Sequence, residues 1–176
     1  MSGGADGADL VWGAEARRHG HKVLHFSFAG HRTQAPPDEL VILSDHDMRR
    51  ADPYLAKASA RLKRHWPPAS KYAANLLRRD WYQVKNAERV YAVASLQENG
   101  QIKGGTAWTV DLFIARHDRR PCEAYLFELN RRQWFKWNTD WEAIAMRPPP
   151  WGMWAGIGTR ALSPSGEAAI RGLFDG

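Results

Sequence analysis

The chain has 176 residues and 44% of them are hydrophobic, so its length fits a single domain over residues 1–176 with a substantial core. A lone cysteine, Cys122, excludes an intramolecular disulfide and a cysteine-based zinc cluster, which fits a reducing, cytoplasmic location. We find no apolar run of transmembrane length and no signal-peptide pattern, so no membrane association is expected. The net charge of +6 favours anionic partners.

Glycine-rich turns, helices and strands alternate along the first half of the chain. Periodic apolar residues identify the helices and short apolar runs identify the strands. In chain order we expect a turn at 2–9 that opens a helix closing at Gly20, a strand at 22–28, a surface loop at 29–43, and helices that begin at Ser44 and after Ser70.

The second half continues this alternation. It predicts a strand at 89–94, a turn at 104–106 that opens a helix, a strand at 123–129, an antiparallel segment at 133–137, a strand at 153–157, and a helix that begins after Ser163. Alternating strands and helices favour a mostly parallel sheet covered on both faces. The expected fold is therefore α/β, a Rossmann-like three-layer sandwich with a small C-terminal β-hairpin.

Three glycine-containing segments stand where helices are expected to begin, at 3–7, 104–106 and 156–160. Free backbone N–H groups and the helix dipole favour anions there, and glycine lets a phosphate approach the backbone closely. In a parallel sheet such turns gather at the carboxyl edge of the strands. None of them is a Walker A motif or a complete G-x-G-x-x-G fingerprint, which disfavours an ATPase or an ordinary NAD dehydrogenase.

Two of these turns resemble the signature turns of the SLOG superfamily, which includes the Smf/DprA proteins and the LONELY GUY phosphoribohydrolases. The segments are 2–9 (SGGADGAD) and 155–160 (AGIGTR). In that superfamily the Gly-x-Gly-Ser/Thr-Arg strand comes first, whereas here it comes last. The resemblance therefore implies a circularly permuted Rossmann-like domain in which the strand before Ser2 is lost or replaced.

The segment 103–111 (KGGTAWTVD) resembles a degenerate form of the LONELY GUY motif Pro-Gly-Gly-x-Gly-Thr-x-x-Glu. Asp111 stands in place of the Glu, and Arg79 lies at the spacing of the family's upstream Arg. The resemblance implies that both are catalytic. The carboxylate would stabilise oxocarbenium-like charge or orient water, and the Arg would bind phosphate or assist the departing base. Because Asp is one methylene shorter than Glu, catalysis does not follow automatically.

The remaining predicted site residues divide into two groups. Those expected to bind phosphate are Ser2, Gly3, Gly4, Gly7, Gly104, Gly105, Thr106, Gly156, Gly158, Thr159 and Arg160; those expected to contact ribose or base are Asp6, Asp9, Trp108 and Tyr82.

Each of these assignments has a purely structural alternative. Asp111 could simply be a solvent-exposed residue of its helix, and Arg79 could be one partner of a surface ion pair. The negative charges of Asp6 and Asp9 could stabilise the positive N-terminal end of their helix. Most of the Trp side chains could pack in the hydrophobic core.

We therefore expect a nucleotide-binding protein that acts as an N-glycosidic hydrolase on a nucleoside 5′-monophosphate or a related nucleotide. One alternative is a non-catalytic sensor of a nucleotide or an NAD-derived ligand. A second is DprA-like binding of single-stranded DNA, which the charge and the aromatic residues favour less. No cofactor or metal is expected, because the histidines lack metal-ligand spacing. The resemblance also implies a homodimer.

Overall fold

The computed structural model describes residues 1–117, 122–146 and 149–175. Its helices are α1 (Ala8–Arg18), α2 (Asp45–Arg49), α3 (Asp52–Leu62), α4 (Lys71–Val84), α5 (Thr106–Arg116) and α6 (Pro164–Arg171), with a short 3-10 helix at Pro37–Glu39. Its strands are β1 (His25–Phe28), β2 (Leu40–Leu43), β3 (Arg89–Ala94), β4 (Ala124–Glu128), β5 (Gln133–Asn138), β6 (Asp140–Ala143) and β7 (Trp154–Gly158).

Serine side chains define three of the helix starts. The hydroxyls of Ser44, Ser70 and Ser163 each accept a hydrogen bond from a backbone N–H in the first turn of the following helix. This satisfies one of the amide groups that a helix leaves unpaired at its N-terminus. The helix starts predicted at these serines are confirmed, although the helix expected after Ser44 is divided into α2 and α3.

The main sheet is mixed, with the strand order β6-β5-β4-β3-β7. The central strand β3 is parallel to both β4 and β7, whereas β5 and β6 extend the sheet in antiparallel fashion beyond β4. The expected hairpin is therefore present at the edge of the sheet, but it precedes β7 and α6 instead of ending the chain. A tight turn joins β4 to β5, and such a turn can connect only antiparallel neighbours.

The short parallel pair β1–β2 is connected to the main sheet through Met1 and Ser2. The Met1 carbonyl accepts from Gly156 of β7, and Ser2 forms a parallel bridge with His25 of β1. Met1 and Ser2 therefore join β7 to β1 at the position where the sequence resemblance predicts a lost or replaced strand. They bring the first turn next to the end of β7.

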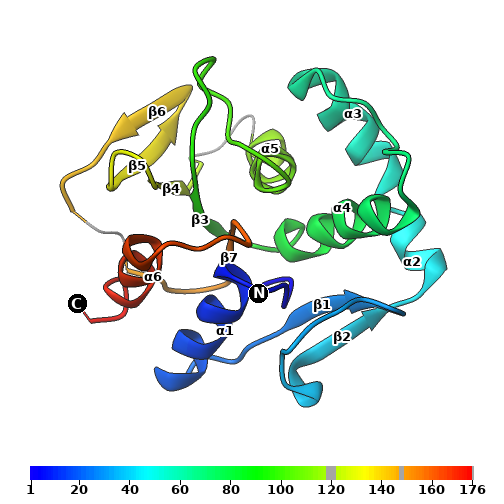
Figure 1. Ribbon diagram of the computed structural model, residues 1–176, viewed down its shortest axis with the longest axis horizontal. Helices are drawn as coiled ribbons and strands as arrows, with labels where there is room; N and C mark the ends of the chain where they lie inside the picture. Colours follow the sequence, from blue (N-terminus) through cyan, green and yellow to red (C-terminus); the bar gives the residue numbers. More distant parts are fainter. Residues whose placement is uncertain (118–121, 147–148, 176) are drawn as a thin grey trace.

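Helices cover both faces of the main sheet (Figure 1). On one face, α1 and α6 pack against Tyr91 and Val93 of β3. On the other face, α5 packs against Val90 and Ala92, the alternate residues of the same strand, and α3 packs on α5. The protein is thus a layered, mixed α/β structure. Because β3 is buried on both faces, its whole sequence is apolar apart from Arg89.

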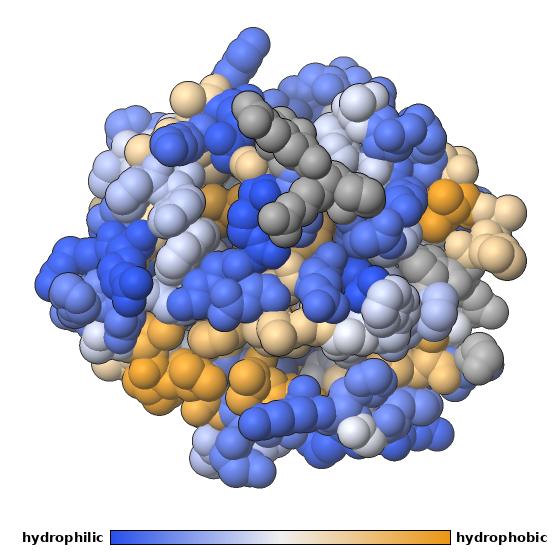
Figure 2. Space-filling view, turned by 180° about the vertical axis from the view of Figure 1, so that it is seen from behind, coloured by the Kyte–Doolittle hydropathy of each residue, from blue (hydrophilic) through white to orange (hydrophobic). Residues whose placement is uncertain are grey.

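Hydrophilic side chains cover most of the face shown in Figure 2, and hydrophobic ones gather at its lower left, on the side of β1 and β2. In β2, Ile42 is 59% exposed. In the part of the chain that the structure describes, no helix is both long and apolar enough to cross a membrane.

Candidate functional site

A cavity of about 690 Å³ opens at the carboxyl ends of β3 and β7. Its wall includes the start of α5, the turn after β7, and buried side chains of α1 and α4. Of the residues predicted from the sequence, the cavity is lined by Asp9, Arg79, Gly104, Gly105, Thr106, Trp108, Gly158, Thr159 and Arg160. The structure therefore brings parts of all three predicted turn regions to one place.

The start of α5 lines the cavity with Gly104, Gly105 and Thr106. Gly105 is its N-cap residue, and no side chain caps the helix. Gly104 has a φ of 74°, a conformation that glycine adopts without strain, and a β-carbon built on either glycine would meet nothing within 4 Å. The first N–H groups of this helix have no side-chain cap and lie at the positive end of the helix dipole, beside the cavity.

The turn after β7 packs directly on the start of α1. The Thr159 carbonyl accepts a hydrogen bond from the Ala8 N–H at 3.1 Å. A β-carbon on Gly7 would lie 2.3 Å from the Arg160 carbonyl oxygen, so only glycine fits this contact. The two turns that resemble the SLOG signature are therefore in contact, and Arg160 is left exposed at the mouth of the cavity.

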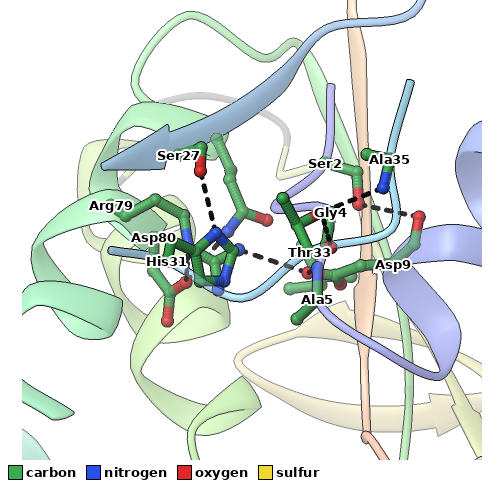
Figure 3. A network of polar contacts seen from close by, with 12 residues as sticks. Ser2, Gly4, Ala5, Asp9, Ser27, His31, Thr33, Ala35, Arg79 and Asp80 are labelled. Atoms are coloured by element: carbon green, nitrogen blue, oxygen red, sulfur yellow. Dashed lines mark hydrogen bonds and ion pairs between the residues drawn. The ribbon is translucent and has the colours of Figure 1, made fainter. Parts of the chain in front are cut away.

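Asp9 organises the first turn from within (Figure 3). Its carboxylate accepts hydrogen bonds from the backbone N–H groups of Ala5 and Gly3 and from Arg79 Nη1, which is 3.2 Å away. These amides already have an anionic partner, so the carboxylate of Asp9 occupies the position that a phosphate would take at this turn. The start of α5 differs from this turn because no side chain caps it.

Arg79 lies between two buried carboxyl groups. Besides Asp9, its Nε is 3.6 Å from Asp80 Oδ1, and all three side chains are at most 12% exposed. Burial raises the pKa of Asp80 to about 7, and the nearby charge of Asp9 acts in the same direction. Arg79, a hydrogen bond from Thr109 and the charge of Arg160 only partly offset this. Burial likewise raises the pKa of Asp9.

Gln83 provides a polar group aimed at the same cavity. Its Nε2 donates to Asp80 Oδ1 at 2.9 Å, and the residue is 1% exposed. Its Oε1 is buried and has no hydrogen-bond partner among the described residues. Because an unpaired buried acceptor costs free energy, this oxygen is available to a donor from a water molecule or from a ligand.

Asp111 does not line the cavity. It lies on α5 but points to α3, where Arg61 binds both of its carboxylate oxygens at 2.6–3.1 Å. Tyr82 is also elsewhere, since its hydroxyl donates to the Asp47 carbonyl and its ring belongs to a separate apolar cluster. Trp108 lines the cavity but is 5% exposed and packs near Trp66.

The other predicted residues at the turns have structural contacts. Ser2 is buried in the sheet and its hydroxyl donates to the Asp9 carbonyl. Gly4 accepts a hydrogen bond from Thr33, Gly156 faces the ring of Trp12, and Asp6 lines a neighbouring cavity.

Sequence reasoning missed Asp80, Gln83 and Thr109, which all line the cavity. The available signal was position: Asp80 and Gln83 follow Arg79 on α4 within one turn, and Thr109 is three residues after Thr106 on α5.

No cluster of three or more His, Cys, Asp or Glu side chains that could hold a metal ion occurs in residues 1–117, 122–146 and 149–175. No protein-family model matches the sequence, and searches of curated proteins and of solved structures found no match.

Proposed function

We propose that this chain is a permuted Rossmann-like protein that binds a phosphate-bearing nucleotide in the 690 Å³ cavity and hydrolyses its N-glycosidic bond. One observation carries the proposal: a buried carboxyl group with a pKa of about 7, Asp80, lines the same cavity as the uncapped start of α5. An anion site beside a carboxyl group that titrates near neutral pH suits a hydrolase that acts on a phosphate-bearing nucleotide.

In this proposal, each part of the ligand has its own contacts in the cavity. The phosphate lies at the backbone N–H groups of residues 104–106, near the exposed Arg160. A ribose hydroxyl donates to the free Oε1 of Gln83. Trp108 is so deeply buried that it offers only part of its ring to the base.

Asp80 replaces Asp111 as the proposed catalytic carboxylate. In its ionised form it accepts a proton from a water molecule as the oxygen attacks C1′ of the ribose. The bonding electrons of the C1′–N bond leave with the base, which takes up a proton from solvent, and Asp80 then returns its own proton to solvent. The negative charges of Asp80 and Asp9 stabilise the positive charge that develops on the ribose. A base with a pKa near the working pH is both ionised and strong enough to accept the proton.

The test compares wild type with Asp80→Asn and Asp111→Asn. Each protein is incubated with a pool of ribo- and deoxyribonucleoside monophosphates, and free base is measured by mass spectrometry. We expect release by wild type and by Asp111→Asn, and a loss of at least about 100-fold for Asp80→Asn, the scale of general-base catalysis. Equal rates for wild type and Asp80→Asn would contradict this role.

The position of Asp111 favours a second candidate, a non-catalytic nucleotide sensor. The carboxylate that the resemblance places at the reacting sugar is bound to Arg61 outside the cavity. Tight binding of one nucleotide that wild type returns unchanged would select this candidate.

A further inference from the structure

A second cavity of about 550 Å³ adjoins the first. The two share Ala5 and Arg160, and the second is completed by Asp6, His31 and Tyr72 together with residues of the loop after β1. The charge of Arg160 acts both on Asp80 in the first cavity and on His31 in the second. Arg160 therefore stands at the junction between them.

Aromatic rings form one wall of the second cavity. The ring of His31 stacks on Phe28 at a centroid distance of 5.0 Å and an interplanar angle of 24°. Tyr72 meets Phe28 edge-on at 5.6 Å. Phe28 covers one face of the His31 ring, and His31 is half-buried and lines the cavity, so its exposed part can contact a flat ligand group.

The wall is held in place by hydrogen bonds. His31 Nδ1 and the buried Ser27 hydroxyl are 2.9 Å apart (Figure 3). Thr33 donates to the Gly4 carbonyl, and the Arg32 N–H donates to the Tyr72 hydroxyl. The loop after β1 is thus tied both to the first glycine turn and to α4. A cavity with walls fixed in this way is preorganised for a ligand.

The charged residues that line the second cavity suit a ligand with a neutral flat group next to a phosphate. Burial, with the positive charges of Arg79 and Arg160, lowers the pKa of His31 to about 4, so its ring is neutral at pH 7. Arg32 and Arg160 face the cavity against the single carboxylate of Asp6. Two guanidinium groups beside a neutral ring fit an anion that is attached to a heterocycle or a sugar.

We propose that the natural ligand has two ends: it is a nucleotide whose 5′-phosphate carries a second group through a phosphodiester or pyrophosphate link. The nucleoside occupies the first cavity, the linking phosphate lies near Arg160, and the second group lies against His31 and Tyr72. This inference rests on the proposed function. Each cavity alone has the size of one small-ligand site, so a mononucleotide fills only the first.

The test is a binding series in which each two-ended probe is matched with its monophosphate. The probes are NAD⁺, ADP-ribose, GDP-mannose, CDP-choline and UDP-glucose, compared with AMP, GMP, CMP and UMP by calorimetry. We expect at least one two-ended probe to bind tenfold more tightly than its monophosphate. Tyr72→Ala and His31→Ala each remove most of this advantage and leave the monophosphate affinity unchanged.

Tyr54→Ala is the control, because Tyr54 is likewise exposed but stacks on Trp81 away from both cavities. It leaves both affinities unchanged. Monophosphates that bind as tightly as their two-ended partners would overturn this inference and leave the proposed function standing. Absence of binding by every nucleotide in the series would overturn both.

Discussion

The guanidinium of Arg79 occupies the space that a side chain on Gly3 would need. A β-carbon on Gly3 would lie 1.1 Å from Arg79 Nη1 and 2.6 Å from Asp9 Oδ2. The first glycine turn is therefore shaped by a buried ion pair behind it, and its lack of a side chain serves that packing. Because Asp9 and Arg79 also line the cavity, the first glycine turn packs directly against the cavity wall.

Gly3→Ala should consequently be far more damaging than Gly105→Ala. The new methyl group at residue 3 displaces Arg79 and costs about 2 kcal/mol or more of unfolding free energy, as overpacking of a buried site does. At Gly105 a β-carbon meets no atom within 4 Å, and the expected change is below about 1 kcal/mol. Urea unfolding of both variants gives the comparison, and equal losses would show that Arg79 moves aside freely.

Arg79→Met should strongly destabilise the protein at neutral pH. It removes the positive charge between Asp9 and Asp80 and leaves two buried carboxyl groups without a cation, which costs about 3–5 kcal/mol in comparable buried pairs. The matched control is Arg61→Met, which removes an ion pair with Asp111 that is more exposed than the Arg79 cluster and contributes about 1 kcal/mol or less.

Chemical unfolding at pH 7 and pH 5 measures this effect. The loss caused by Arg79→Met should shrink at pH 5, because raised pKa values let the two carboxyl groups become neutral. If Arg79→Met were as stable as Arg61→Met at pH 7, the carboxyl groups of Asp9 and Asp80 would already be neutral in the wild type.

The sequence predicts the elements around the cavity well because their signals are local. Serine caps, glycine turns and the apolar run of β3 each act within a few residues. Two strands were missed. Leu40–Leu43 follows a proline-rich stretch that indicates a loop, and Asp140–Ala143 is short and largely exposed.

The assignment of side chains to the site is less predictable, because it depends on how each helix is rotated. Thr109 and Asp111 are two residues apart on α5, which places them about 200° apart around the helix axis. The cavity lies on the side of Thr109, and Arg61 lies on the side of Asp111. A family motif transfers spacing along the chain, but it does not transfer this rotation.

The first glycine turn shows a second limit of sequence reasoning. Its amide groups fit a phosphate site by composition, yet the Asp9 carboxylate fills that role for Gly3 and Ala5. Asp80 was overlooked because charged residues are usually exposed, whereas here α4 is covered where Arg79 and Asp80 lie. The ion pair that joins Asp9 to Arg79 links residues 70 positions apart, and no local sequence signal reveals it.

The proposed role of Asp80 predicts a specific pH–rate profile. As the pH rises through about 7, Asp80 loses its proton and becomes the base, so base release by wild type should increase and then level off. Asp111→Asn should keep this profile, since Asp111 contacts Arg61 and not the cavity. A rate that falls through pH 7 would instead identify Asp80 as a proton donor to the leaving base.

The same carboxyl group predicts an unusual dependence of stability on pH. The pKa of Asp80 rises from 3.8 in the unfolded chain to about 7 in the folded protein, so between these values the folded state binds more protons. The contribution of Asp80 to stability is complete below pH 4 and is lost as the pH rises to 7. His25 and His31, whose pKa values are lowered to about 4, act in the opposite direction between pH 4 and 6.5.

Comparing Asp80→Asn with wild type at each pH cancels the histidine contribution. From pH 5 to pH 8 the variant should gain roughly 1–3 kcal/mol of unfolding free energy relative to wild type, since one pKa unit corresponds to about 1.4 kcal/mol. The measurement is urea unfolding at half-unit steps of pH, with Asp111→Asn as a control whose difference from wild type stays constant. If the Asp80→Asn difference is also constant over this range, Asp80 is ionised in the folded protein throughout, and its proposed protonation near pH 7 is wrong.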